Sequence, residues 1–300
     1  MNFPVAGFAR LTRPANLPTA AADIFAGMAI AGAVPGSFDT SLWEGPGLLK
    51  GIFLIVSSVL LYAGGVVLND VYDLETDKTE RPERPIPSGV VSLIAAATFG
   101  TFLLIFGVVM AFLCHTISGL IALILAVFIV IYDAYAKRFT VLGPLNMGIC
   151  RGLNLVLGMT VLGEIIRPEF ALIPLVYIFA ITLISRGEVH GENKNHIIWA
   201  GILYILVILA VLTTVVTKSA NIVQLLPFLL FFSSMIFMPL WTAYRVNSPE
   251  NIKKAVVAGV LSLIILDASV AVAFSAWWYG ILILLLLPLS IWLSRIFAVT

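Results

Sequence analysis

Residues 69–88 read NDVYDLETDKTERPERPIPS and follow directly on an apolar run over residues 49–69. The stretch holds six of the chain's 16 acidic residues, and three basic residues lie among them. About 20 consecutive apolar residues are enough for a helix to cross a bilayer. No proline interrupts the stretch before Pro82, so the helix can continue into the acidic residues. The sequence therefore predicts a transmembrane helix that carries carboxylates at its water-facing end.

The rest of the chain has the composition of an integral membrane protein. Of its 300 residues, 61% are hydrophobic and 11% are charged, and the mean hydropathy is +1.08. Soluble domains carry roughly 25% charged residues, and the net charge of +1 argues against a nucleic-acid partner. We predict an all-α, polytopic transmembrane helical bundle that forms one integral domain over residues 1–300. Ten apolar runs are candidate spans, near residues 17–36, 49–69, 90–114, 117–135, 141–163, 169–186, 196–217, 221–243, 252–274 and 276–295.

The distribution of basic residues predicts the orientation of the bundle. If the N-terminus is cytoplasmic and all ten runs span, 13 of the 17 lysines and arginines fall in inner loops. Three fall in outer loops, namely Lys50, Arg167 and Lys218, and Arg151 lies within a run. Cytoplasmic loops of membrane proteins are enriched in Lys and Arg. The asymmetry therefore places residues 69–88, and a second polar stretch at residues 185–195, on the cytoplasmic side.

Four oxygen-bearing side chains of the acidic stretch share or border one helical face. Asp70, Asp73 and Asp77 are three and four residues apart, and Asn69 lies four residues before Asp73. Like charges gathered this closely are unfavourable unless a cation neutralises them. Mg²⁺ prefers hard oxygen ligands and commonly retains waters and substrate phosphates. The spacing favours a Mg²⁺–diphosphate site, with Arg84 available to bind phosphate, over an ordinary solvated loop.

Two runs in this region resemble a known family. Residues 69–77 resemble the NDxxDxxxD motif of the UbiA superfamily of intramembrane prenyltransferases, and residues 81–89, RPERPIPSG, resemble the RPxRPIxSG run that follows it. The resemblance implies nine helices around a central cavity. It also implies Mg²⁺-dependent transfer of a prenyl group from a prenyl diphosphate to an aromatic or hydroxylated small-molecule acceptor. By this resemblance Asp70 and Asp73 are catalytic, and the metal ligands include Asn69, Asp70, Asp73 and Asp77.

UbiA-type enzymes carry a second acidic motif, DxxxD, after their sixth helix. Residues 185–195 read SRGEVHGENKN, so Glu188 and Glu192 stand where the family has aspartates. Residues four apart share a helical face, and glutamate is also a hard oxygen ligand, so both are predicted metal ligands. His190, two residues from each, is expected to point away from them. The run SRGEVHG also resembles the UbiA-like proteins named EboC.

A third polar cluster ends the run over residues 117–135. Tyr132, Asp133, Tyr135, Lys137 and Arg138 gather there and resemble a Y…KR element of the family. The resemblance implies that Lys137 and Arg138 clamp the diphosphate during catalysis and that Tyr132 and Tyr135 bind substrate. Anchoring of the helix at the membrane interface accounts for these residue types equally well.

Ionisable residues inside the apolar runs form the last set of candidates. Arg151 lies one turn before Asn154 in the run over residues 141–163, and Asp267 lies deep in the run over residues 252–274. A buried arginine needs a partner, and a diphosphate or a facing carboxylate would serve. Substrate binding and helix–helix hydrogen bonding therefore both remain open for Arg151 and Asn154.

A membrane transporter or ion pathway is the alternative function. It would use Asp70, Asp133, Arg151 and Asp267 as a relay, but the carboxylates crowd one membrane face, whereas transporter sites lie near the midplane. We therefore favour the enzyme. We expect it in a bacterial inner membrane, where prenyl diphosphate and acceptor reach the site from the cytoplasmic side.

Overall fold

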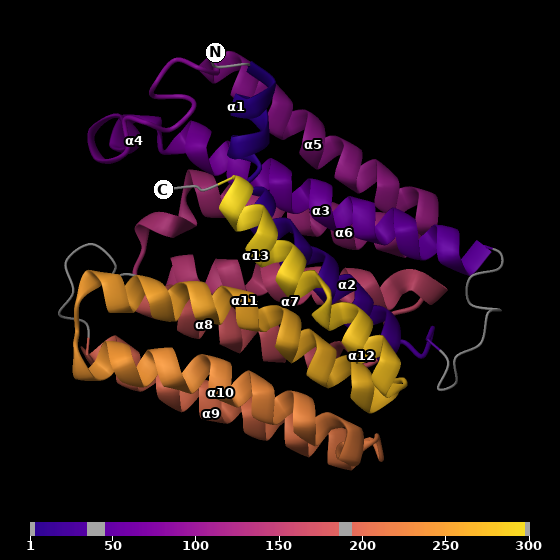
Figure 1. The fold of residues 1–300 in the computed structure, drawn as a ribbon. Helices are drawn as coiled ribbons and strands as arrows, with labels where there is room; N and C mark the ends of the chain where they lie inside the picture. Colours follow the sequence, from indigo (N-terminus) through magenta and orange to yellow (C-terminus); the bar gives the residue numbers. More distant parts are fainter. Residues whose placement is uncertain (1–3, 35–45, 186–193, 298–300) are drawn as a thin grey trace.

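The computed structural model describes residues 4–34, 46–185 and 194–297, and this part of the chain forms a bundle of helices without a strand (Figure 1). The predicted all-α class is thereby confirmed. The helices are α1 Pro4–Leu11, α2 Leu17–Ile30, α3 Pro46–Tyr72, α4 Leu74–Glu80, α5 Leu93–Cys114, α6 Thr116–Ala134, α7 Leu142–Met159, α8 Leu172–Ser185, α9 Lys194–Thr217, α10 Ile222–Arg245, α11 Pro249–Phe274, α12 Trp277–Leu284 and α13 Leu286–Ile296.

Nine helical segments in the described part of the chain are long and apolar enough to cross a membrane. They are α3, α5 to α11, and the segment Trp277–Ile296, which contains α12 and α13. This last segment is interrupted at Leu285, where Pro288 in the following turn lacks the backbone N–H that would bond to Leu284. Nine of the ten apolar runs thus form helices of spanning length.

The remaining run, residues 17–36, forms a shorter helix in the interior. α2 has 14 residues, 11 of them buried, and it packs against α3, α7 and α11. The sequence AAADIFAGMA gives α2 mostly small side chains, so neighbouring helices approach closely. A Cβ atom at Gly27 would lie 2.5 Å from the carbonyl oxygen of Leu155, so the backbones of α2 and α7 are in direct contact.

The acidic stretch begins inside α3, as predicted. The helix runs through Asn69 and Asp70 to Tyr72. At Asp73 the backbone leaves the regular helix, with φ −91° and ψ 4°, and α4 begins at Leu74. In Figure 1, α4 lies at the same end of the bundle as α1 and the end of α13. The carboxylates of this stretch are therefore gathered at one end of the bundle.

Large apolar side chains cover the outside of the bundle. Ile105 on α5, Trp199 on α9 and Leu230 on α10 are 60%, 61% and 68% exposed. In water so much exposed apolar surface would be unfavourable, whereas lipid solvates it. The nine apolar helices and this surface describe an integral membrane protein with several spans.

Candidate active site

A buried arginine bridges two of the three aspartates. Nη1 of Arg84 lies 3.1 Å from Oδ1 of Asp70 and 2.7 Å from Oδ2 of Asp77. Arg84 belongs to the turn RPERPIPSG after α4, where the hydroxyl of Ser88 donates a hydrogen bond to the Arg84 carbonyl oxygen at 2.7 Å. Nη2 of Arg13, which precedes α2, lies 2.5 Å from Oδ1 of Asp70. Basic groups from two distant segments thus converge on the end of α3.

Arg13 is constrained by both its backbone and its ion pair. Its φ of 46° lies in the left-handed region, which costs a non-glycine residue roughly 1 kcal/mol. Burial lowers the pKa of its guanidinium, but Asp70, Tyr62 and Asp77 together outweigh burial, so the pKa of Arg13 is raised. The ion pair with Asp70 therefore keeps the charge of Arg13 fixed beside the acidic stretch.

Asp73 contacts a different basic residue. Because the helix is interrupted at this position, the Asp73 carboxylate meets Nζ of Lys137 at 2.6 Å. Lys137 lies on the short 3₁₀ helix η3, Ala136–Arg138, and its ammonium is 5.9 Å from the centre of the Tyr72 ring. Asp70 and Asp77 thus share Arg84 from two separate helices, α3 and α4, whereas Asp73 contacts Lys137. The predicted single helical face is interrupted at Asp73.

Tyr135 and Arg138 lie away from this cluster. Both are exposed, and the ring of Tyr135 packs on the ring of Phe139 with centroids 4.8 Å apart. Neither side chain lines the cavity described below. Their placement fits the interface-anchoring alternative, whereas Lys137 reaches the aspartates.

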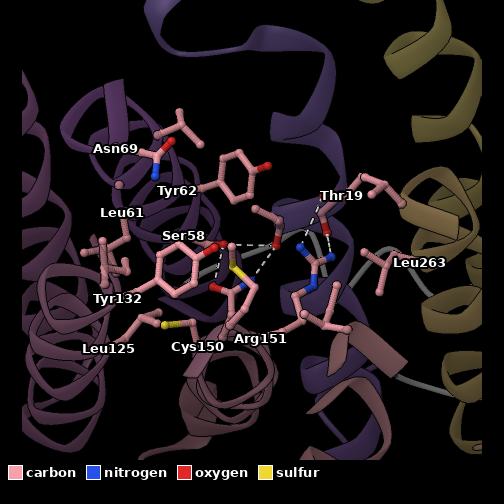
Figure 2. Close-up of a pocket in the computed structure, with 18 of the residues that line it drawn as sticks. Thr19, Ser58, Leu61, Tyr62, Asn69, Leu125, Tyr132, Cys150, Arg151 and Leu263 are labelled. Carbon is pink, nitrogen blue, oxygen red and sulfur yellow. Dashed lines mark hydrogen bonds between the residues drawn. The ribbon is translucent and has the colours of Figure 1, made fainter. Parts of the chain in front are cut away.

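A cavity of 330 Å³ adjoins the acidic end of α3 (Figure 2). Side chains from α2, α3, α6, α7, α8 and α11 form its wall. Asn69, Tyr132 and Asp133 line its outer end, and Ser58 lines its inner end, about 16 Å from Asn69 along the α3 axis. Most of the wall between these ends is apolar, including Leu61, Leu125, Ile129, Ile178, Ile181 and Leu263. An apolar chain with a charged head therefore matches the cavity and its outer end.

A layer of polar side chains closes the inner end of the cavity. The Ser58 hydroxyl donates to Oδ1 of Asn154 at 2.7 Å, and Nδ2 of Asn154 donates to Oδ2 of Asp23 at 2.7 Å. Nε of Arg151 lies 2.7 Å from the same Asp23 oxygen, and Nη2 of Arg151 lies 4.0 Å from Oδ2 of Asp267. Figure 2 shows Arg151 directed toward Thr19 on α2. The facing carboxylate expected for Arg151 is thus provided mainly by Asp23.

Asp23 and Ser58 are two polar residues of this layer that the sequence analysis missed. Both are fully buried. The signal for Asp23 was present, since an ionisable residue inside an apolar run usually has a partner. No sequence spacing links Asp23 to Arg151, because the two residues are brought together by the packing of α2 on α7.

The donor chemistry at the end of α3 fits a divalent cation. Two carboxylates, those of Asp70 and Asp77, already flank a single cationic nitrogen of Arg84. Aspartate oxygens and the Asn69 amide oxygen are the hard ligands that Mg²⁺ prefers. Within residues 4–34, 46–185 and 194–297, no three acidic, histidine or cysteine side chains converge on one point. Glu188, His190 and Glu192 lie outside the described residues.

Comparison with known proteins places this geometry in a family. The profile of the UbiA prenyltransferase family matches residues 22–255. The chain is 39% identical over 126 residues to digeranylgeranylglyceryl phosphate synthase of Methanococcoides burtonii, covering 42% of this chain and 41% of that protein. It is 32% identical to the enzyme of the same name from Sulfolobus acidocaldarius over 196 residues, 64% of this chain and 66% of that one. The chain thus matches only part of the length of these relatives. They are archaeal, so a bacterial inner membrane finds no support.

Solved structures share the fold. The apo structure of a UbiA homologue from Aeropyrum pernix K1 has a TM-score of 0.66 at 16% identity, covering 85% of this chain and 97% of that one. A UbiA homologue from Archaeoglobus fulgidus bound to GPP and Mg²⁺ has a TM-score of 0.59 at 12% identity, covering 88% and 99%. With the family profile matched over residues 22–255, the chain belongs to the UbiA prenyltransferase family.

Proposed function

We propose that this protein transfers a prenyl group from a prenyl diphosphate to a small-molecule acceptor within the membrane, with Mg²⁺ as the metal ion. The observation that carries the proposal is the position of three aspartates and their basic partners at one end of a mostly apolar cavity. Such a site can hold a charged head and an apolar tail at the same time. The archaeal relatives' names, which describe prenylated glyceryl phosphates, support the same reaction class.

The basic residues are suited to bind the diphosphate. Arg13, Arg84 and Lys137 each face an aspartate, so the cluster has no large excess of either charge. Asp70, Asp73 and Asp77 would hold Mg²⁺, and their basic partners would then be free to contact phosphate oxygens. When bound, Mg²⁺ supplies positive charge that stabilises the departing diphosphate. Glu188 and Glu192 are proposed as a second group of metal ligands.

The cavity protects the reacting carbon from water. In the reaction, the bond between the allylic carbon and the diphosphate oxygen breaks, and its electron pair leaves with the diphosphate. The nucleophilic atom of the acceptor bonds to that carbon and loses its proton to water. Leu61, Ile129 and Ile178 on the cavity wall can exclude water from the cationic carbon until the acceptor attacks.

The acceptor is proposed to be a hydroxylated molecule, of the glyceryl phosphate type that the relatives' names describe. An aromatic acceptor is the second candidate. Both classes must enter near Asn69 and Tyr132, at the end of the cavity where the diphosphate is proposed to bind. The positive-inside asymmetry supports entry from the cytoplasmic side.

The proposal is tested by diphosphate release from geranyl diphosphate in purified protein with added acceptor. Release should require Mg²⁺ and stop with EDTA. Asp70→Asn and Asp73→Asn should each lower the rate of diphosphate release by about 100-fold or more. Both variant proteins should still insert in the membrane. Glu250→Gln, an exposed substitution on α11, is the matched control and should retain the rate. Unchanged activity in Asp73→Asn would contradict the metal assignment.

Transport remains the alternative because of one observation. Arg151, Asp23 and Asp267 form a buried charged group between α7, α2 and α11, where a relay residue could lie. A transporter would move protons or ions across liposomes that contain the protein and would release no diphosphate. Ion flux without diphosphate release would replace the enzymatic proposal.

A further inference from the structure

Asp133 is a buried carboxylate of the cavity wall that the ion pairs at the end of α3 do not use. It lies one residue before the end of α6, is 2% exposed and lines the cavity. Its Oδ1 accepts a hydrogen bond from Nδ2 of Asn69 at 2.9 Å. Among the residues that the structure describes, it has no cationic partner within ion-pair distance, unlike Asp70, Asp73 and Asp77.

Several other polar side chains of the cavity wall are already engaged within the protein. Ser58 and Asn154 bond to each other, and Arg151 bonds to Asp23. The Thr182 hydroxyl donates to the Ile178 carbonyl of its own helix. A buried carboxylate has capacity for several hydrogen bonds, and leaving that capacity unused is unfavourable. Asp133 is therefore a wall residue that can accept a further hydrogen bond from a ligand.

The location of Asp133 relates it to the reacting end of the cavity. Its hydrogen-bond partner, Asn69, immediately precedes Asp70, which is held by Arg13 and Arg84. The new bond must form next to the diphosphate, and a nucleophile bound at Asp133 would be close to that point. A group bound at the inner layer around Ser58 would instead be about 16 Å away along the α3 axis.

We propose that Asp133 binds the acceptor by accepting a hydrogen bond from its hydroxyl group, and that Asn69 fixes the orientation of the carboxylate. This inference rests on the proposed function and assigns the position of its second substrate. It also selects a hydroxyl acceptor over an acceptor that attacks through an aromatic carbon, since only the former must present an O–H group to the site. Asp133 is then a substrate-binding residue separate from the metal site.

The test compares two acceptor probes in wild-type protein and Asp133→Asn. One probe is geranylgeranylglyceryl phosphate with its free hydroxyl, and the other is the same molecule with that hydroxyl methylated. Wild-type protein should bind the hydroxyl probe about tenfold or more tighter than the methylated one. Asp133→Asn should lose that preference, because the amide presents an N–H group where the carboxylate oxygen was. The comparison isolates one hydrogen bond, as a double-mutant cycle does.

Donor binding separates this role from a metal-binding role. The dissociation constants of Mg²⁺ and of geranyl diphosphate should be unchanged in Asp133→Asn, and kinetic measurements should show a raised acceptor KM. Loss of Mg²⁺ or donor binding in the variant would overturn the inference, as would equal binding of both acceptor probes by wild-type protein. Absence of diphosphate release by wild-type protein would instead reject the proposed function, and the two failures are therefore distinguishable.

Discussion

The ammonium of Lys137 lies 2.6 Å from the carboxylate of Asp73, and this contact joins η3, after α6, to the end of α3. We predict that Lys137→Gln weakens binding of geranyl diphosphate about tenfold, because a charged donor to phosphate is lost. The dissociation constant in the presence of Mg²⁺ is the measurement. Lys253→Gln, on the exposed surface of α11, is the control. If the Lys137 variant binds geranyl diphosphate as tightly as wild-type protein does, Lys137 only neutralises the charge of Asp73.

Arg84 leads to a prediction about stability and metal binding. Arg84→Met leaves the buried carboxylates of Asp70 and Asp77 without their shared cation. The substitution should lower the free energy of unfolding by about 3 kcal/mol. Mg²⁺ should restore part of this loss, so the metal-induced rise in Tm should be larger in the variant than in wild-type protein. Arg81→Met, at an exposed position three residues earlier, should leave both quantities unchanged. A variant that Mg²⁺ does not stabilise would exclude Asp70 and Asp77 as its ligands.

The second acidic motif gives a ranking of variants. Glu188→Gln retains size but removes charge, so it should weaken Mg²⁺ activation most. Glu188→Asp retains the charge and shortens the side chain, so its effect should be smaller. His190→Ala should be mildest, because residues two apart in a helix point about 160° away from each other around its axis. The Mg²⁺ dependence of diphosphate release measures all three. A ranking led by His190→Ala would show that these glutamates are not the metal ligands.

Orientation in the membrane can be measured with introduced cysteines. In a chain whose Cys114 and Cys150 are replaced by alanine, Thr79→Cys on α4 should resist an impermeant thiol reagent added outside intact cells. Ser219→Cys, in the exposed turn between α9 and α10, should react. The expectation follows from the distribution of Lys and Arg. The reverse labelling pattern would place the acidic end of the bundle outside the cell.

The spans and the acidic end of α3 could be predicted because both depend on local sequence. Apolar length predicted ten spans, nine of which form helices of spanning length in the described part of the chain, and the residues after residue 69 continued α3 to Tyr72. The length of α2 was overestimated, since hydropathy alone does not indicate where a helix ends. The break at Asp73 was also missed, because its local sequence, YDLET, contains neither glycine nor proline.

Pairings between helices could not be predicted from spacing. Arg84 and Asp77 are in contact and lie only seven residues apart in the sequence. Arg151 and Asp23 are 128 residues apart, and their contact depends on the close packing of α2 and α7. The sequence analysis identified Arg151 as needing a partner without identifying Asp23. The contact with Asp23 supports the helix–helix role that was left open for Arg151, while its place on the cavity wall keeps the substrate role open.

The buried group of Arg151, Asp23 and Asp267 predicts an order of stabilities. Arg151→Met leaves two buried carboxylates without a cation and should be most destabilising, by about 3 to 5 kcal/mol. Asp23→Asn should cost less, because Arg151 retains Asp267. Asp267→Asn should cost least, because its carboxylate is 4.0 Å from Arg151, whereas that of Asp23 is 2.7 Å away.

Thermal unfolding in detergent measures this order. Lys78→Met is the control for removal of a surface charge. It breaks the exposed Lys78–Glu75 pair, also at 2.7 Å, and should lower the free energy of unfolding by less than about 1 kcal/mol. Replacing all three buried groups, with Arg151→Met, Asp23→Asn and Asp267→Asn combined, should recover much of the stability lost in Arg151→Met alone, since no unpaired charge remains. If Asp267→Asn lowers the stability more than Arg151→Met does, the charge of Arg151 is not what stabilises this layer. Arg151 would then act by binding a ligand in the cavity.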